Sequence, residues 1–385
     1  MMKKSVKKVM LPVMAAAMAV SFGALVSAED ETISLTVWGA EEDQTLLKEL
    51  TDNFQAAYPD QTFDIQIGVE SESTAKDTVL TDVEAAADVY AFADDQITDL
   101  VKAGALLKLD DYAEVLQMAG KTLDDVKDAN VEGSVDAATI DGGLYAFPRA
   151  ADNGYFLYYD ASVLSEEDVA SWSSLLEAAD AAGKKVGMTL ASGWYNASFF
   201  YGAGFTTGLN EDGTTAIDWN GTSADGYTGV DVVKGMLAIS GSPAFMAIAD
   251  GDISNQLASG NLAACVSGTW DAMTAQEVFG DGYAATKLPT FTVGDQEVQQ
   301  GSVAGYKYIG VNGYSENSGW AVLLADYLSN EEAQQKFFDE RESGPSNKNV
   351  GASDAIKENV ALSALAQQSE YAQAQKVGGK YWDPS

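Results

Sequence analysis

The 385-residue chain contains no histidine. This absence removes the commonest general base, the pairs in which histidine activates serine or cysteine, and any metal site built on imidazole. Glycoside hydrolysis stays open, because it needs only two carboxylates and the chain has 58 acidic residues. Other hydrolytic chemistry is disfavoured, and we expect neither a metal nor a cofactor.

Two further residue classes are scarce. Cys265 is the only cysteine, so no disulfide can form within the chain, and its apolar neighbours at 262–266 favour a buried, inert thiol. Lysine and arginine number 22 against 58 acids, which gives a net charge of −36. Such a charge repels nucleic acid and anionic lipid and leaves a neutral or cationic partner, although an acidic surface can also serve solubility alone.

The N-terminus has the features of an export signal. Four lysines precede an apolar run at 9–20, and small residues at 26–28 suit a cleavage site. The apolar run is far shorter than the roughly 20 residues that span a bilayer. We therefore predict a signal peptide at 1–28 and a mature protein that works in the periplasm or outside the cell.

The remaining sequence has the pattern of an α/β protein. Its length predicts about two domains, and 46% apolar residues are enough to bury a large core. Strands are expected at 33–38, 62–69 and 88–92, with helices at 46–58 and 74–86 between them. This order predicts a mostly parallel sheet, whose ligand sites lie beyond the carboxyl ends of its strands.

A second α/β unit follows a turn and a proline at 141–148. Its expected elements are a strand at 155–159, a helix at 171–183 and a strand at 185–190. The Asn-Glu-Asp-Gly sequence at 210–213 predicts a hairpin turn. A calcium loop is the alternative there, but the ligand spacing of an EF-hand is missing.

Several short motifs occur in a fixed order along the chain. They are LTVW at 35–38, the block 87–107, GLYAFP at 143–148, SWSSL at 171–175, GTW at 268–270, LPTF at 288–291, and the segments 304–305 and 309–312. Each motif is weak alone. Together they resemble the carbohydrate-binding proteins of ABC importers, particularly the maltose and maltodextrin-binding branch, from about residue 33 to the end.

This resemblance implies a two-lobed periplasmic-binding-protein fold of the class II type, in which each lobe is a mostly parallel sheet flanked by helices. Lobe 1 is expected at 29–148 plus 292–342, lobe 2 at 152–288 plus 346–385, and hinge segments near 148–152, 288–292 and 342–346. The signal lacks the cysteine through which such receptors are lipidated, which implies free diffusion in a periplasm or another tether. The chain also ends where family members typically continue, so lobe 2 is expected to lack its last layer.

A neutral sugar presents hydroxyls around its rim and C–H patches on its faces, so a receptor needs polar acceptors and aromatic platforms. Glu42 and Asp43 follow the first strand and are predicted hydroxyl acceptors, although acids there also favour the start of the next helix. The resemblance implies that Phe92 is an aromatic residue of the cleft and that Asp95 binds hydroxyls. A helix cap is the alternative for Asp95. Gln96 stands where the maltose branch has arginine.

The interlobe segment and lobe 2 supply the other expected contacts. Arg149, Asp152 and Asn153 lie where the family places a sugar-binding acid, and the alignment leaves Asp152 and Asn153 open. Trp194 or Tyr195, which follow a strand and begin a helix, is expected to stack on the sugar.

Trp270 is the aromatic platform that the resemblance fixes best, through the glycine and the strand before it. A buried structural tryptophan is the alternative. Trp382 is expected to add a third platform.

The resemblance implies an exported receptor that captures maltose or maltooligosaccharides by hinge closure and delivers them to the membrane permease of an ABC importer. We expect a monomer that binds no nucleic acid and is not an enzyme. The alternatives are a receptor of the same fold for another oligosaccharide or a polyamine, and a two-carboxylate glycosidase. The acidic surface favours the polyamine, and the tryptophans favour the sugar.

Overall fold

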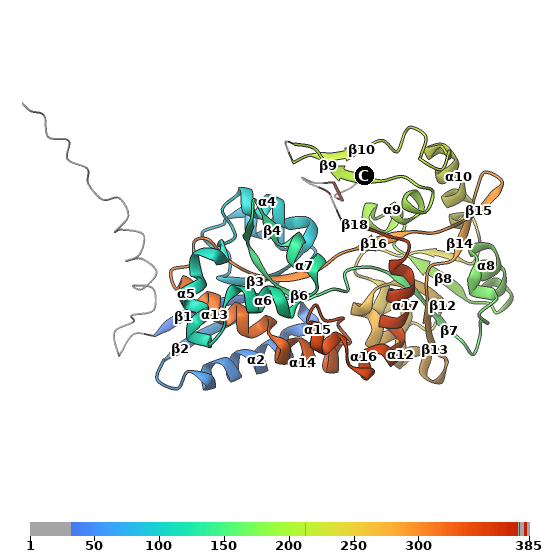
Figure 1. Cartoon of the computed structure of the whole chain (residues 1–385). Helices are drawn as coiled ribbons and strands as arrows, with labels where there is room; N and C mark the ends of the chain where they lie inside the picture. Colours follow the sequence, from blue (N-terminus) through green and yellow to red (C-terminus); the bar gives the residue numbers. More distant parts are fainter. Residues whose placement is uncertain (1–31, 212, 376, 378–380, 383–385) are drawn as a thin grey trace, which may run out of the picture.

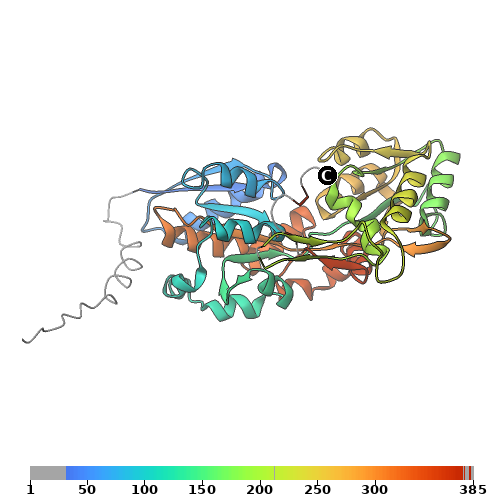
Figure 2. The ribbon, with the colours of Figure 1, turned by 90° about the horizontal axis from the view of Figure 1, so that it is seen from above.

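The computed structural model describes residues 32–211, 213–375, 377, 381 and 382, and the predicted signal peptide at 1–28 lies outside them. These residues form two lobes side by side, each built on a five-stranded sheet with helices packed on it (Figure 1). Figure 2 shows the same two lobes from above. The predicted two-lobed α/β fold is confirmed. Among the described residues, every helix is too short or too polar to pass through a lipid bilayer.

The sheet of lobe 1 has the strand order β2-β1-β3-β17-β6. β1 pairs in parallel with β2 and β3, whereas β17 runs antiparallel to β3 and β6. Four of the five strands therefore point the same way, as expected for a mostly parallel sheet. The strands are β1 (Ile33–Gly39), β2 (Phe63–Val69), β3 (Val89–Ala93), β6 (Ala146–Ala150) and β17 (Lys307–Val311).

Burial explains how the sequence specifies this lobe. β1 alternates buried and largely exposed residues, and the first helix buries Leu46, Leu47, Leu50 and Phe54 along one face. β3 is buried at every position, because a central strand of such a sheet is covered on both faces. The helices are α2 (Gln44–Ala57), α3 (Ala75–Thr81), α4 (Ile97–Lys102), α5 (Ala113–Leu116), α6 (Leu123–Ala129), α7 (Glu132–Ala137), α13 (Ser318–Ser329), α14 (Glu331–Arg341) and α15 (Lys348–Gly351), with the small strand pair β4 (Thr139–Ile140) and β5 (Gly143–Leu144).

The sheet of lobe 2 repeats this arrangement, with the order β11-β8-β12-β7-β13. β8 is parallel to β11 and β12, and β7 is antiparallel to β12 and β13. Cys265 is fully buried in β12, as predicted. The elements are β7 (Phe156–Asp160), β8 (Lys185–Met188), β11 (Phe245–Ala247), β12 (Leu262–Ser267) and β13 (Tyr283–Thr286), with α8 (Trp172–Ala181), α9 (Gly193–Gly202), α10 (Gly229–Ser240), α11 (Ile253–Ala258), α12 (Ala272–Phe279) and α17 (Val360–Ser369).

The first crossing of the chain between the lobes lies near its predicted position, and the second does not. The first runs from β6 to β7 and overlaps the segment predicted near 148–152. The second lies between β16 (Ser302–Ala304) and β17, not at 288–292. The strand pair β14 (Thr290–Val293) and β15 (Gln296–Gln299) lies with lobe 2, where Phe291, Val293 and Val303 enter the core. The expectation that lobe 1 resumes at 292 is therefore wrong.

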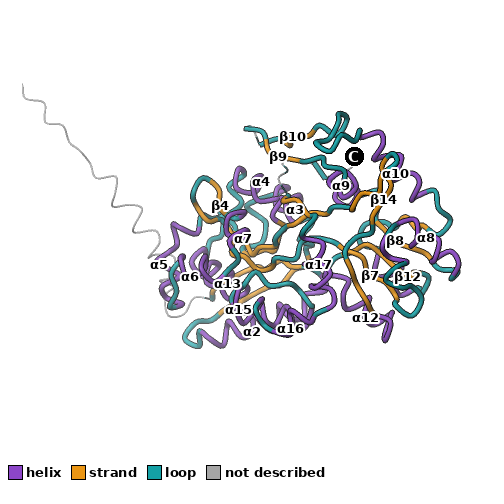
Figure 3. Tube along the Cα trace, turned by 45° about the vertical axis from the view of Figure 1, so that its right-hand side comes forward, coloured by secondary structure: helices purple, strands orange, loops and turns teal. Residues whose placement is uncertain are grey.

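The third crossing is also displaced. α15 packs against α14 of lobe 1, whereas α17 packs against β13 and β7 of lobe 2. The chain therefore crosses through the short helix α16 (Asp354–Glu358), beyond the segment predicted at 342–346. Figure 3 shows this run of helices between the two sheets.

Three extended segments lie together where the lobes meet. The backbone N–H of Ala151 donates to Gly344 O (2.9 Å), and that of Asn153 donates to Gly305 O (3.2 Å). Ala150 also forms an antiparallel bridge with Pro345. Residues 150–153 are thus held between the other two segments, and we call this three-segment joint the strap.

A hairpin of lobe 2 reaches lobe 1 away from the strap. It consists of β9 (Thr207–Leu209) and β10 (Thr215–Ile217), and the predicted turn at 210–213 is confirmed by a hydrogen bond from Gly213 N to Asn210 O (2.9 Å). Figure 3 shows this hairpin beside α4. A Cβ built on Gly213 would collide with the Lys102 ammonium of α4. The lobes are therefore in contact at the hairpin tip as well as at the strap.

Candidate ligand-binding site

The expected site residues lie largely on short turns that follow strands. The 3₁₀ turn Glu41–Asp43 follows β1, the turn Asp94–Gln96 follows β3, and the turn Thr269–Asp271 follows β12 after one glycine. The carboxyl ends of these strands face the region between the lobes, as expected for open α/β sheets. The strap supplies the remaining residues.

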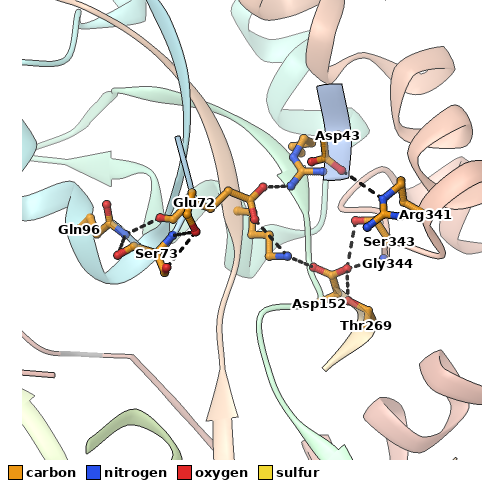
Figure 4. A network of polar contacts seen from close by, with 12 residues as sticks. Asp43, Glu72, Ser73, Gln96, Asp152, Thr269, Arg341, Ser343 and Gly344 are labelled. Carbon is orange, nitrogen blue, oxygen red and sulfur yellow. Dashed lines mark hydrogen bonds and ion pairs between the residues drawn. The ribbon is translucent and has the colours of Figure 1, made fainter. Parts of the chain in front are cut away.

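A buried group of charged side chains occupies the lobe 1 side. Glu72 pairs with the Arg149 guanidinium and with the Lys307 ammonium (3.3 Å), and Lys307 also approaches Asp152 Oδ1 (3.7 Å). Burial would raise the pKa of Glu72, but Arg149 and Lys307 outweigh burial and hold that pKa below its usual value. Figure 4 shows this network. Because buried charges require such partners, the group holds its members in fixed positions.

Asp152 connects both lobes. Its Oδ2 accepts hydrogen bonds from Thr269 Oγ1 of lobe 2 (2.8 Å), from Ser343 Oγ (3.0 Å) and from Gly344 N (2.7 Å), and the residue is 1% exposed. Figure 4 shows these bonds converging on one carboxylate. Asp152, predicted as a sugar-binding acid, is therefore already occupied as a joint between the lobes. Arg149 is equally engaged, because it is 3% exposed and lies over the Phe337 ring (4.4 Å).

The two acids after β1 differ from each other. Glu42 is exposed, whereas Asp43 is largely buried and pairs with Arg341 (3.3 Å). Burial raises the pKa of Asp43, and the neighbouring Arg149 opposes that rise. Asp43 thus joins the buried polar network, and Glu42 remains at its rim.

Two tryptophans of lobe 2 face this network. The rings of Trp194 and Trp270 lie 5.8 Å apart at 47°, and both are half-buried. The Lys307 ammonium of lobe 1 lies 5.3 Å from the Trp270 ring centroid. Trp270 is therefore on the interlobe face, which decides against a wholly buried structural tryptophan.

Burial disfavours a ligand contact for Phe92 and decides between Trp194 and Tyr195. Phe92 is fully buried between Tyr90 and Tyr308, because β3 is the central strand and both of its faces are covered. Tyr195 is 5% exposed and packs on Tyr155 (4.9 Å), since adjacent helical residues point in directions about 100° apart. Trp194 is therefore the accessible member of the Trp194 and Tyr195 pair.

The turn after β3 carries adjacent acids. Asp94 is 9% exposed and accepts a hydrogen bond from Gln375 Nε2 (2.9 Å), and the Asn153 side chain also bonds to it. Burial raises the pKa of Asp94 well above its usual value and raises that of Asp95 to about 6. Asn153 is therefore directed to the acidic turn, while Asp152 is directed to the strap.

Gln96 and Trp382 do not join the polar group around the tryptophans. Gln96 is buried, and its Nε2 donates to the backbone oxygens of Glu72 and Ser73, which fixes the loop that carries Glu72. Trp382 packs on Tyr381 (4.7 Å), and no ring contact within the described part of the chain joins it to the Trp194 and Trp270 pair. The role of Trp382 as a third platform stays a prediction.

Sequence reasoning missed four residues of the site. Glu72 lies just beyond β2, so the rule that pointed to the acids after β1 and β3 also applied to it. Asp94 precedes the predicted Asp95 by one position. Lys307 begins an otherwise apolar strand, an uncommon place for a buried cation. Gln375 carries no signal in the sequence.

Comparisons with known proteins agree on the fold. The family described as bacterial extracellular solute-binding protein matches residues 49–364. A solved structure determined with acarbose is 30% identical, with 92% of this chain and 90% of that chain covered and a TM-score of 0.79. The maltodextrin-binding protein MalE1 from L. casei BL23 without ligand is 23% identical (coverage 90% and 88%, TM-score 0.69). The maltose/maltodextrin-binding domain MalE from Bdellovibrio bacteriovorus bound to maltotriose is 17% identical (coverage 90% and 90%, TM-score 0.75). A search of curated proteins finds no match.

Proposed function

We propose that this chain, which belongs to the bacterial extracellular solute-binding protein family, captures a maltose-type oligosaccharide between its lobes and delivers it to an ABC importer. The receptor is exported, acts as a monomer, and catalyses no reaction. Its function is to bind the sugar outside the cytoplasmic membrane and to present the closed form to the permease.

The observation that carries this proposal is the placement of Trp194 and Trp270. Two half-buried indoles on one lobe, opposite a polar network on the other, match the two kinds of surface on a pyranose. The C–H faces of the sugar would stack on the rings. Its hydroxyls would bond to acceptors across the interface, where each bond to a charged group contributes about 1.5–3 kcal/mol.

We assign the polar contacts to the turns after β1 and β3 and to the strap. Asp95 and Asn153 would bind hydroxyls, with Glu42 at the rim, whereas the Asp94 carboxyl is already engaged by Gln375 and Asn153. Arg149 and Asp152 would act through the strap, because the Arg149 guanidinium pairs with Glu72 and Asp152 Oδ2 accepts hydrogen bonds from Thr269 and Gly344. The predicted roles of these two residues therefore become positional.

Hinge closure would convert binding into a signal. The strap joins the lobes along one side, so a ligand that contacts both lobes stabilises the closed form by its differential affinity. The permease would recognise surfaces that come together only in that form. No bond in the sugar needs to break.

Support from relatives is of two kinds. The family match places the chain among receptors that bind solutes. The structure that was determined with acarbose, a carbohydrate, shares 30% of its residues with this chain over nearly its whole length. The more distant maltose/maltodextrin-binding domain bound to maltotriose supports the fold.

Calorimetric titration tests the ligand class. The panel is maltose to maltotetraose, two oligosaccharides without glucose, and putrescine. We expect saturable binding of the maltooligosaccharides. Binding of putrescine alone would contradict the proposed sugar receptor and indicate a polyamine receptor. Incubation with maltotriose followed by chromatography tests for catalysis, where any enzymatic release of glucose contradicts the receptor function.

A further inference from the structure

Gln375 connects the two lobes through its side-chain amide. It follows strand β18 (Ala372–Ala374), which pairs in parallel with β16 of lobe 2. Its Nε2 donates to Asp94 Oδ1 of lobe 1 (2.9 Å), and its Oε1 accepts from the Trp194 indole N–H of lobe 2 (2.8 Å). Both ends of one amide are therefore used, one on each lobe.

This amide spans the second crossing of the chain. On the lobe 2 side, Ala304 pairs with Ala374, the residue before Gln375. On the lobe 1 side, Asp94 N donates to Tyr306 O (3.0 Å). Only Gly305 lies between these two anchored positions. Any rotation of the backbone there must change the distance between Gln375 and Asp94.

The surroundings leave the amide little freedom. Gln375 is 8% exposed and Asp94 is 9% exposed. A Cβ built on Gly305 would collide with Gln375 Nε2 and lie 2.7 Å from Asp94 Oδ1. A buried polar group that loses its partner bears the cost of desolvation. The geometry therefore favours one hinge angle, at which both hydrogen bonds are made.

We infer that Gln375 is a positioning residue that latches the lobes at this hinge angle before ligand arrives, and that it couples the angle to the placement of Trp194. The indole N–H of Trp194 donates to the same amide, and both residues belong to lobe 2, so opening the hinge breaks the bond to Asp94 and leaves the amide without its second anchor. In a receptor with this latch, the amide that holds the indole N–H is anchored at both ends only when the lobes are close. The latch itself requires no bound sugar.

Distance measurements between spin labels test the latch in the full chain. Met118 of lobe 1 and Leu237 of lobe 2 are 55% and 64% exposed, and each is replaced by cysteine for labelling. Cys265 is fully buried, which limits its reaction with the label. The test variant is Gln375→Met, which keeps the length of the side chain and removes both hydrogen bonds. The control is Gln373→Met, because Gln373 Nε2 donates to Phe205 O within lobe 2 (2.8 Å).

We expect one main distance in the ligand-free protein and in Gln373→Met. In Gln375→Met the ratio of latched to unlatched forms should fall about tenfold, the effect of one lost interlobe hydrogen bond to a carboxyl group. The double variant Asp94→Asn with Gln375→Glu reverses donor and acceptor and should restore the main distance. This rescue separates loss of the latch from damage to folding.

Three outcomes would overturn the latch. They are an unchanged distance in Gln375→Met, an equal change in Gln373→Met, and a double variant that stays as open as Gln375→Met although circular dichroism shows it folded. A consequence for affinity rests on the proposed function, since Gln375→Met should weaken maltotriose binding about tenfold. Failure of sugar binding in every variant, the wild type included, would count against the proposed function. The distances between the spin labels would still test the latch.

Discussion

Removal of the Asp152 carboxylate provides the sharpest test of how the lobes are joined. Asp152→Ala deletes the acceptor of three hydrogen bonds, which come from Thr269, Ser343 and Gly344. It also removes one of two carboxylates beside Lys307, and leaves Glu72 at 3.3 Å as the other. The side chain is almost wholly buried, so solvent water does not reach the site to replace the lost partner.

The expected destabilisation follows from these contacts. Breaking a buried ion pair by deleting one partner costs about 3–5 kcal/mol, and Glu72 keeps the Lys307 charge compensated, which favours the lower end. Asp152→Ala should therefore lower the free energy of unfolding by about 3 kcal/mol. Asp152→Asn keeps an acceptor and removes the charge, so it should cost about 1–3 kcal/mol.

Urea unfolding followed by circular dichroism measures this difference, with the slope compared between variants because two lobes can unfold in separate steps. Ser343→Ala is the matched control. It removes a single donor to the same carboxylate and should cost about 1.5 kcal/mol, the lower end for a hydrogen bond to a charged group. A loss in Asp152→Ala no larger than that of Ser343→Ala would refute the view that Asp152 fastens the lobes.

Three further predictions concern single residues. Trp270→Ala should weaken maltooligosaccharide binding by about 1–3 kcal/mol in calorimetry through loss of a stacking surface, and unchanged affinity would remove Trp270 from the site. Phe92→Ala should cost about 3–5 kcal/mol of stability in urea unfolding while the folded protein keeps its affinity, and a specific loss of affinity would return Phe92 to the ligand contacts. Since burial raises the pKa of Asp95 to about 6, its stability contribution is complete below about pH 4 and is lost as the pH rises through 6. Asp95→Asn should thus be more stable than the wild type by about 1–3 kcal/mol above pH 6 and equal to it near pH 4, as measured by thermal unfolding, and a constant difference would contradict this pKa.

Periodicity was sufficient to predict much of the fold. The alternation in β1 and the helical spacing of α2 follow directly from which side chains leave water, and both elements occur as predicted. The lobe boundaries were harder to predict. Phe291 and Val293 could have packed in either lobe, because an alternating strand pair shows that it has an apolar face but not which core that face covers.

The site was predictable where position along a strand decides function. Trp270 lies in the turn after β12, and the structure places its ring beside Lys307 of lobe 1. The predicted ligand contact of Phe92 is disfavoured because this residue lies inside β3, where both faces of the sheet are covered. Gln375 could not be foreseen, since its role depends on a strand pairing between residues about 70 positions apart in the chain.

The strap has a consequence for how motion can be described. Its three segments are hydrogen-bonded to one another, from Ala151 to Gly344 and from Asn153 to Gly305, so they cannot twist independently. A joint tied in this way leaves the two lobes one main axis of rotation relative to each other. One measured angle would then describe the whole excursion, and a solution scattering curve could be fitted with that one parameter.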